Sequence, residues 1–139
     1  MRRYLVVSNQ TLSSEALVEK VRSCLAAGPC QFHVVVPATH GRDHLTWTEG
    51  HDRAIAHDRL EGALERLRGL GAEADGEVGD ARPMDAIADA LLGAPGFDEI
   101  ILVTLPPGVS RWLRQDLPHR AERTFRIAVT HLVAQPAPA

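Results

Sequence analysis

The stretch Tyr4-Leu5-Val6-Val7-Ser8 is a short, near-continuous apolar run that is rich in β-branched residues. Such a run is typical of a strand buried on both faces of a parallel sheet, because a half-exposed strand would alternate apolar and polar residues. Comparable runs occur at residues 32–37, 97–104 and 125–133. The sequence therefore predicts a sheet whose central strands are covered on both sides.

Segments with helical periodicity separate these runs. Their apolar stripes are Leu17, Val21, Cys24 and Leu25; then Ala56, Leu60, Ala63, Leu64 and Leu67; then Met84, Ile87, Ala88, Leu91 and Leu92. Glycine stops each helix, at Gly28, Gly69 and Gly93. Residues 109–124 predict a further helix in two pieces, broken near Leu117-Pro118, because proline interrupts a helix interior.

Residues 72–78 alternate small and acidic side chains, which predicts a third strand with one face in water. Glu73, Asp75 and Glu77 should point toward solvent. Charged side chains on a short strand discourage pairing with another chain, so this strand suits an edge of the sheet.

Strands and helices thus alternate along the whole chain. Strands separated by helices need right-handed crossovers, which give a parallel sheet with helices on both faces. Ligands of such sheets bind outside the carboxyl ends of the strands, where the strand order reverses. The segments at these ends are residues 8–11, 37–40, 79–80 and 104–108.

Over nearly its whole length the chain resembles the universal stress protein family. The resemblance rests on the strand–helix order, the length of 139 residues, the Gly79-Asp80 turn and the strands at residues 98–103 and 127–132. Residues 104–114 also resemble a segment in a subgroup of bacterial stress-protein-like sequences of unassigned function. That segment reads Leu-Pro-Pro-Gly-x-Ser-Arg-Trp-Leu-Arg from residue 105.

The resemblance implies a single-domain, three-layer αβα sandwich of the α/β class. Its five-stranded parallel sheet would have the order 3-2-1-4-5, a Rossmann-like arrangement of the adenine nucleotide alpha hydrolase-like type. We expect this domain to cover residues 1–134, with residues 135–139 as a short frayed tail. Members of the family are often homodimers, and some of them bind ATP.

The chain departs from the pattern of the ATP-binding members. Those members carry an acid after the first strand and Gly-x2-Gly-x9-Gly-Ser/Thr after the fourth strand. Asn9 stands at the acidic position, and Gly108 follows two prolines that lack N–H donors. Asp116 stands about where the last glycine would fall, and its charge would repel phosphate. We therefore expect no ATP binding through a glycine-loop phosphate cradle.

Five arginines follow this loop: Arg111, Arg114, Arg120, Arg123 and Arg126. A guanidinium suits phosphate or carboxylate, so one hypothesis is an anion site that replaces the glycine loop. The other is a solvated helix face that pairs with residues 43–99, which hold fourteen acids and five bases. The second interpretation is favoured for the last three arginines, whereas Arg111 and Arg114 directly follow the candidate loop.

The candidate ligand-binding residues are Ser8, Asn9, Val36, Asp80, Thr104, Gly108, Ser110, Arg111 and Arg114. Ser110 is also a candidate cap for the helix that follows it. A hydrolase site from Ser8, Ser110 and His131 is not favoured, because the sequence has no Gly-x-Ser-x-Gly elbow. We therefore predict no catalytic residues.

A metal site is the chemistry that a group of histidines raises. It would need two of His40, His44, His51 and His57 to converge with Asp43 or Asp52. Surface histidines are the simpler interpretation of this group. We therefore predict no metal.

Composition limits the function classes. Apolar residues make up 45% of the chain, charged residues 24%, and the net charge is −3. This balance excludes a broadly basic nucleic-acid binder and gives no reason for a polybasic membrane anchor. No apolar run approaches the ~18 residues that a membrane span needs. Without a secretory signal we expect a cytoplasmic protein with reduced cysteines.

These observations lead to three functional hypotheses. The favoured one is a small binding or regulatory protein of the universal stress type. The alternatives are a binder of AMP, ATP or a small anion through Arg111 and Arg114, and a small enzyme with an anionic substrate. We also expect a homodimer through the fifth strand or the helix before it. The fifth strand is predicted to be the longer and more apolar edge of the sheet.

Overall fold

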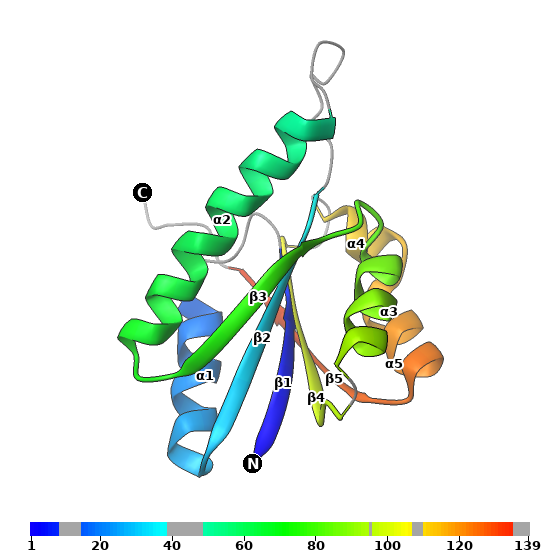
Figure 1. Cartoon of the computed structure of the whole chain (residues 1–139). Coiled ribbons are helices and arrows are strands. Elements are labelled where there is room, and N and C mark those ends of the chain that lie inside the picture. The colour runs from blue at the N-terminus through cyan, green and yellow to red at the C-terminus, as the bar shows by residue number, and fades with distance from the viewer. Residues whose placement is uncertain (9–14, 39–48, 95, 107–109, 135–139) are drawn as a thin grey trace.

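The protein folds as a three-layer α/β sandwich around one parallel sheet (Figure 1). The structure, a computed structural model, describes residues 1–8, 15–38, 49–94, 96–106 and 110–134. The strands are β1 (Arg2–Val7), β2 (Cys30–Pro37), β3 (Glu73–Gly79), β4 (Glu99–Thr104) and β5 (Ala128–Val133). Their order is β3-β2-β1-β4-β5, and all four pairings are parallel. The predicted fold class and strand order are confirmed.

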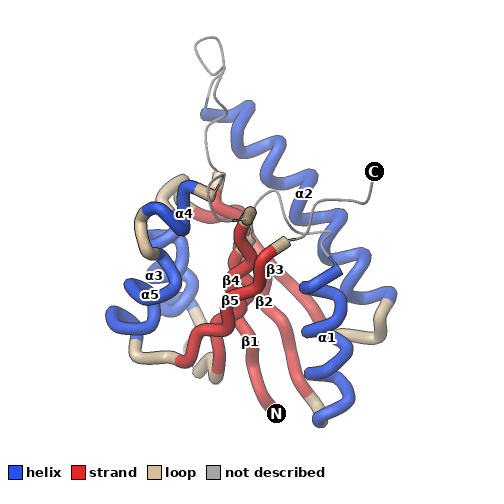
Figure 2. The backbone as a smooth tube through the Cα atoms, turned by 180° about the vertical axis from the view of Figure 1, so that it is seen from behind, coloured by secondary structure: helices blue, strands red, loops and turns tan. Residues whose placement is uncertain are grey.

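The helices form two layers, one on each face of the sheet. Helices α1 (Glu15–Ala27) and α2 (Glu49–Gly69) cover one face. Helices α3 (Pro83–Gly93), α4 (Arg111–Arg114) and α5 (Leu117–Phe125) cover the other, as both views of the backbone show (Figures 1 and 2). Among the described residues, no helix is both long and apolar enough to cross a membrane.

Strand β1 is the centre of the sheet, and its alternating side chains enter both cores. Tyr4 and Val6 belong to the cluster beneath α1 and α2, and Leu5 and Val7 belong to the cluster beneath α3, α4 and α5. All four side chains are buried. The apolar run at the start of the sequence therefore behaves as predicted for a doubly covered strand.

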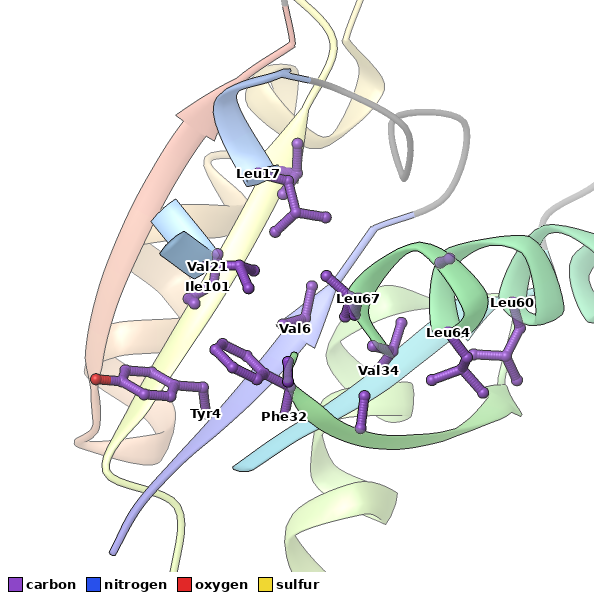
Figure 3. Close-up of a cluster of buried hydrophobic side chains, with 14 of the residues drawn as sticks. Tyr4, Val6, Leu17, Val21, Phe32, Val34, Leu60, Leu64, Leu67 and Ile101 are labelled. Carbon is purple, nitrogen blue, oxygen red and sulfur yellow. The ribbon is translucent and has the colours of Figure 1, made fainter. Parts of the chain in front are cut away.

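The cluster beneath α1 and α2 is the larger one (Figure 3). Leu17 and Val21 reach it from α1, and the stripe Leu60, Leu64 and Leu67 reaches it from α2. Within this cluster the rings of Tyr4 and Phe32 stack, with their centroids 5.2 Å apart. Cys24 and Cys30 are free thiols buried in the same cluster. The predicted stripe of α2 is confirmed, because Ala56 and Ala63 are buried as well.

One predicted stripe was partly wrong. Leu92 was assigned to the buried face of α3, but 83% of it is exposed. The buried residues of α3 are Ala86, Ile87 and Ala90. At 3.6 residues per turn, Leu92 lies well around the helix from Ile87 and points away from the sheet.

The last strand starts later than expected. The sequence predicted a strand over residues 125–133, but Phe125 ends α5 and Arg126 has a left-handed conformation with φ 55°. The N–H of Arg126 donates to the carbonyl of Glu122 at 2.9 Å and closes the helix. Strand β5 then has six residues and β3 has seven, so the expectation that the fifth strand is the longer edge was wrong.

The opposite edge has the predicted chemistry. On β3, Glu73, Asp75 and Glu77 are exposed, as the alternation indicated. His33 of β2 lies between two of these acids, with Nδ1 2.7 Å from Asp75 and Nε2 3.0 Å from Glu77. The acidic strand is thus tied to its neighbour by side chains as well as by the backbone.

Candidate functional site

Three polar side chains are buried among the described residues, and all three lie near the carboxyl ends of β1 and β4. Ser8, Thr104 and Ser110 are 0%, 2% and 3% exposed. Ser8 follows β1, Thr104 ends β4, and Ser110 directly precedes α4. From β1 the chain passes to α1 on one face, and from β4 it passes to α4 on the other face. This reversal is the topological switch point of the sheet, where open α/β folds bind ligands.

Thr104 links the site to the edge strand β5. Its Oγ1 lies 3.0 Å from the carbonyl of Leu105 and 2.7 Å from Nε2 of His131. A hydroxyl has one proton, so if Thr104 donates to the carbonyl, the Nε2–H of His131 donates to Oγ1. Partial burial of the imidazole, and then the nearby charge of His119, lower the pKa of His131 below 6.5. The neutral ring that makes this hydrogen bond is therefore favoured.

Ser110 is the cap of α4, as its position in the sequence suggested. Its Oγ accepts the N–H of Leu113 at 3.2 Å, the third residue of the helix. Its own N–H donates to the carbonyl of Pro106 at 3.1 Å and closes the turn before the helix. Two backbone donors after the proline loop are thereby used inside the protein.

The same is true of other backbone amides along this edge. Ser8 donates to the carbonyl of Val35 at 3.3 Å, and Ala38 donates to that of Gly79 at 3.1 Å. Ala134 donates to the carbonyl of Thr104 at 2.8 Å. These amides form hydrogen bonds between neighbouring strand ends, so they are not directed at a ligand.

Two of the predicted ligand residues have structural roles. Val36 is fully buried in the larger cluster. Asp80 is exposed, and its Oδ1 accepts the N–H of Arg82 at 2.9 Å, a local turn contact. Asp80 follows β3, the edge strand, so two strand spacings of about 4.8 Å each separate it from the β1 side of the site.

The remaining predicted residues divide into two groups. Arg114 ends α4 and is exposed. Asn9, Gly108 and the side chain of Arg111 lie outside the described residues. The structure therefore brings Ser8, Thr104 and Ser110 to one edge.

Sequence reasoning missed the pairing of Thr104 with His131. His131 was considered only as a hydrolase base, yet its Nε2 contacts a threonine and not a serine. The signal was available, because both residues lie near the carboxyl ends of strands that are adjacent in the predicted order.

The histidine group gives no evidence of a metal centre in the described part of the chain. His57 lies on α2 with Nε2 3.7 Å from Oε1 of Glu61, one turn further along the helix. His40, His44 and the side chain of His51 lie outside the described residues. Within the described ranges, no three metal-ligating side chains gather at one point.

Solved structures similar to this one share its fold. A universal stress protein family protein from Arabidopsis thaliana with AMP bound has a TM-score of 0.68 and 8% identity, covering 99% of this chain and 97% of that chain. A universal stress protein in complex with cAMP has a TM-score of 0.61 and 16% identity, covering 96% and 98%. A universal stress protein from Archaeoglobus fulgidus has a TM-score of 0.56 and 15% identity, covering 97% and 94%.

These likenesses span almost the full length of each pair of chains. The chain therefore has the universal stress protein fold. No protein-family model matches the sequence, and no curated protein matches it either. At these identities the shared property is the fold, and the chemistry of the site has to be argued from the residues of this chain.

Proposed function

We propose that this chain is a small binding and regulatory protein of the universal stress type. Its ligand site would lie at the switch point between β1 and β4, and it would not hold ATP in a glycine-loop cradle. The observation that carries the proposal is that Ser8, Thr104 and Ser110, all buried, lie where β1 ends and where the chain leaves β4 for α4. Open α/β sheets bind ligands at this edge, so polar side chains at the ends of these two strands favour a binding role.

The argument against an ATP cradle is a count of donors. Pro106 and Pro107 have no N–H, and the N–H groups of Ser110 and Leu113 are used by internal hydrogen bonds. A triphosphate cradle needs several backbone N–H groups that converge on the phosphates. Asp116 adds a carboxylate beyond α4, and its Oδ1 lies 2.8 Å from Nδ1 of His119.

A second candidate function is binding of an AMP-like nucleotide or another small anion. It is favoured by the AMP and cAMP in two structures of the same fold. In this chain Arg111 and Arg114 directly follow the capped turn at Ser110. Charge-assisted hydrogen bonds from such guanidinium groups contribute about 1.5–3 kcal/mol each.

Isothermal titration with ATP, AMP and cAMP separates these functions. We expect no micromolar ATP binding by the wild-type protein. Binding of AMP or cAMP that is lost in the Arg111→Gln, Arg114→Gln double variant would favour the second candidate. Arg22→Gln, an exposed position on α1, is the matched control for the lost charge. Micromolar ATP affinity that survives in the double variant would contradict the proposal.

We also propose that the protein works in the cytoplasm as a homodimer through β5 or α5. The free, buried thiols Cys24 and Cys30 suit a reducing compartment. Strand β5 is the sheet edge without carboxylates, whereas β3 carries three. Light scattering at tens of micromolar should give a dimer that Ala128→Lys weakens and Asp75→Lys, on the opposite edge, leaves intact. A wild-type monomer would contradict this assembly.

A further inference from the structure

A pocket of about 510 Å³ opens between the start of α3 and the pair α4 and α5. Its walls include Arg82, Met84 and Asp85 from the α3 side and Trp112, Gln115 and Arg120 from the α4–α5 side. This volume lies within the range of small-molecule sites, about 300–1,000 Å³. The lining contains none of the buried polar residues at the strand ends, so the pocket is separate from the site described above.

One wall of the pocket is aromatic. Trp112 is half-buried and packs against the smaller hydrophobic cluster, which anchors the indole in the layer of α3, α4 and α5. The same side chain also lines the pocket. An anchored indole offers a planar apolar surface on which an aromatic ring can stack.

The charged wall is predominantly positive. Arg120 is exposed, and within the described residues its hydrogen bond is to the carbonyl of Gln115, 3.4 Å from Nη1. A guanidinium has five N–H donors, so most of them are left for a ligand. Arg82 is 84% exposed, and its Nη1 lies 3.9 Å from Asp85, a long contact. Two guanidinium groups against one carboxylate favour an anion.

We propose that this pocket binds a small planar anion. An aromatic ring would stack on Trp112, and its carboxylate or phosphate group would be held by Arg120 with Arg82 beside it. This site goes beyond the proposed function, because it uses neither the switch point nor Arg111 and Arg114. It also gives a role to Trp112 and Arg120, which belong to the arginine-rich segment singled out in the sequence.

Tryptophan fluorescence tests the proposal directly. Trp47 and Trp112 are the two tryptophans of the chain, so in a Trp47→Phe protein the signal reports on Trp112 alone. The probes are benzoate and phenyl phosphate, with cyclohexanecarboxylate and benzyl alcohol as controls that lack the planar ring or the charge. We expect saturable quenching by one or both planar anions, and a Kd at least about tenfold weaker for each control.

Substitutions then locate the binding. Arg120→Gln should raise the Kd by about tenfold or more, because it removes a charge-assisted hydrogen bond. Arg123→Gln, exposed on the same helix and outside the pocket lining, should leave the Kd unchanged. Arg114→Gln should also leave it unchanged. In Trp112→Leu, calorimetry should find that benzoate no longer binds more tightly than cyclohexanecarboxylate.

Several outcomes would overturn the proposal. They are the absence of saturable binding by either planar anion, equal binding of the controls, and a Kd that Arg120→Gln leaves unchanged. Loss of binding in Arg114→Gln would assign the anion to the switch point instead. A tighter Kd for phenyl phosphate identifies a phosphate ligand, and a tighter Kd for benzoate identifies a carboxylate. The pocket and the proposed function are tested with different variants. The pocket can therefore fail its test while the proposed function stands, and the proposed function can fail while the pocket stands.

Discussion

The two faces of the sheet are built differently. In the part of the chain that the structure describes, the cluster beneath α1 and α2 contains twenty buried residues and four partly buried ones at its margin. Over the same described residues, the cluster beneath α3, α4 and α5 contains eleven buried residues and seven partly buried ones. The first face is a closed core, whereas the second has a wide, half-open margin. The difference suggests that one face supplies stability and the other leaves room for a pocket.

Helix length explains the difference. Helix α2 has 21 residues, while α3, α4 and α5 have 11, 4 and 9. At 1.5 Å per residue, α2 is about 31 Å long, longer than the strands β2 and β3 that it covers, whereas α3 is about 17 Å long and shorter than either strand. On the second face, β2 and β3 carry the paired side chains of His33, Asp75 and Glu77, and the two carboxylates are 80% and 46% exposed.

Truncating an aromatic residue on each face should give the largest contrast. Phe32→Ala removes a side chain that is 1% exposed and stacked on Tyr4, so we expect a loss of about 3–5 kcal/mol in the free energy of unfolding. Trp112→Ala on the second face should cost less, because Trp112 is only half-buried. Urea denaturation of both variants measures the two losses. An equal or larger loss for Trp112→Ala would show that the second face is no less a core than the first.

The fold was predictable from the sequence because its main determinants are local. The run at residues 4–8 and the stripe of α2 carry periodic burial patterns, and both are confirmed. The errors occur where tertiary contacts determine which face of a helix is buried or where an element begins. Leu92 is apolar and fits the predicted buried stripe, but the residues of α3 that are buried are Ala86, Ile87 and Ala90. The left-handed turn at Arg126, after which β5 starts only at Ala128, leaves no clear mark in the sequence.

The candidate site was predictable only in its location. The switch-point rule selected the edge that holds Ser8, Thr104 and Ser110, and the capping role of Ser110 is visible in the local pattern. The contact between Thr104 and His131 joins residues 27 positions apart and depends on the register of β4 and β5. The pocket beside Trp112 depends on how α3 packs near α4 and α5, which periodicity does not encode.

Two glycines of β3 allow the tightness of packing on the two faces to be compared. A Cβ at Gly76 would lie 2.5 Å from the carbonyl oxygen of Val34 and 2.7 Å from Leu60 of α2. A Cβ at Gly79 would lie 2.9 Å from the Cβ of Ala86 on α3 and 3.0 Å from Val35. We expect Gly76→Ala to cost about 1–3 kcal/mol, because a carbonyl on the neighbouring strand cannot move aside.

Gly79→Ala should cost less than Gly76→Ala. The two nearest atoms are side-chain atoms of Ala86 and Val35, and the short helix α3 can shift more easily than a central strand. Midpoints of thermal unfolding for both variants, measured at one pH, give the comparison. A greater loss for Gly79→Ala would mean that the second face is packed as rigidly as the first.

The smallest expected effect is the pH dependence of stability that comes from His131 on the second face. His131 pairs in register with Leu102, which belongs to the cluster of that face, and its pKa lies below 6.5 because the folded protein partly buries the ring. The unfolded chain therefore binds more protons than the folded chain as the pH falls through this range. The contribution of the neutral His131 to the free energy of unfolding should be fully present above about pH 6.5. It should decrease as the pH falls toward the pKa of His131 in the folded protein.

Replacing the imidazole should remove that part of the pH dependence. In His131→Gln, the unfolding midpoint should fall less steeply between about pH 7.5 and pH 5 than in the wild-type protein. Thr104→Val is the matched variant, because it removes the hydrogen bond at Oγ1 but keeps the imidazole. Since burial is the larger cause of the lowered pKa, Thr104→Val should retain most of the wild-type slope. If Thr104→Val abolishes the slope as His131→Gln does, the hydrogen bond and not burial controls the proton on this face.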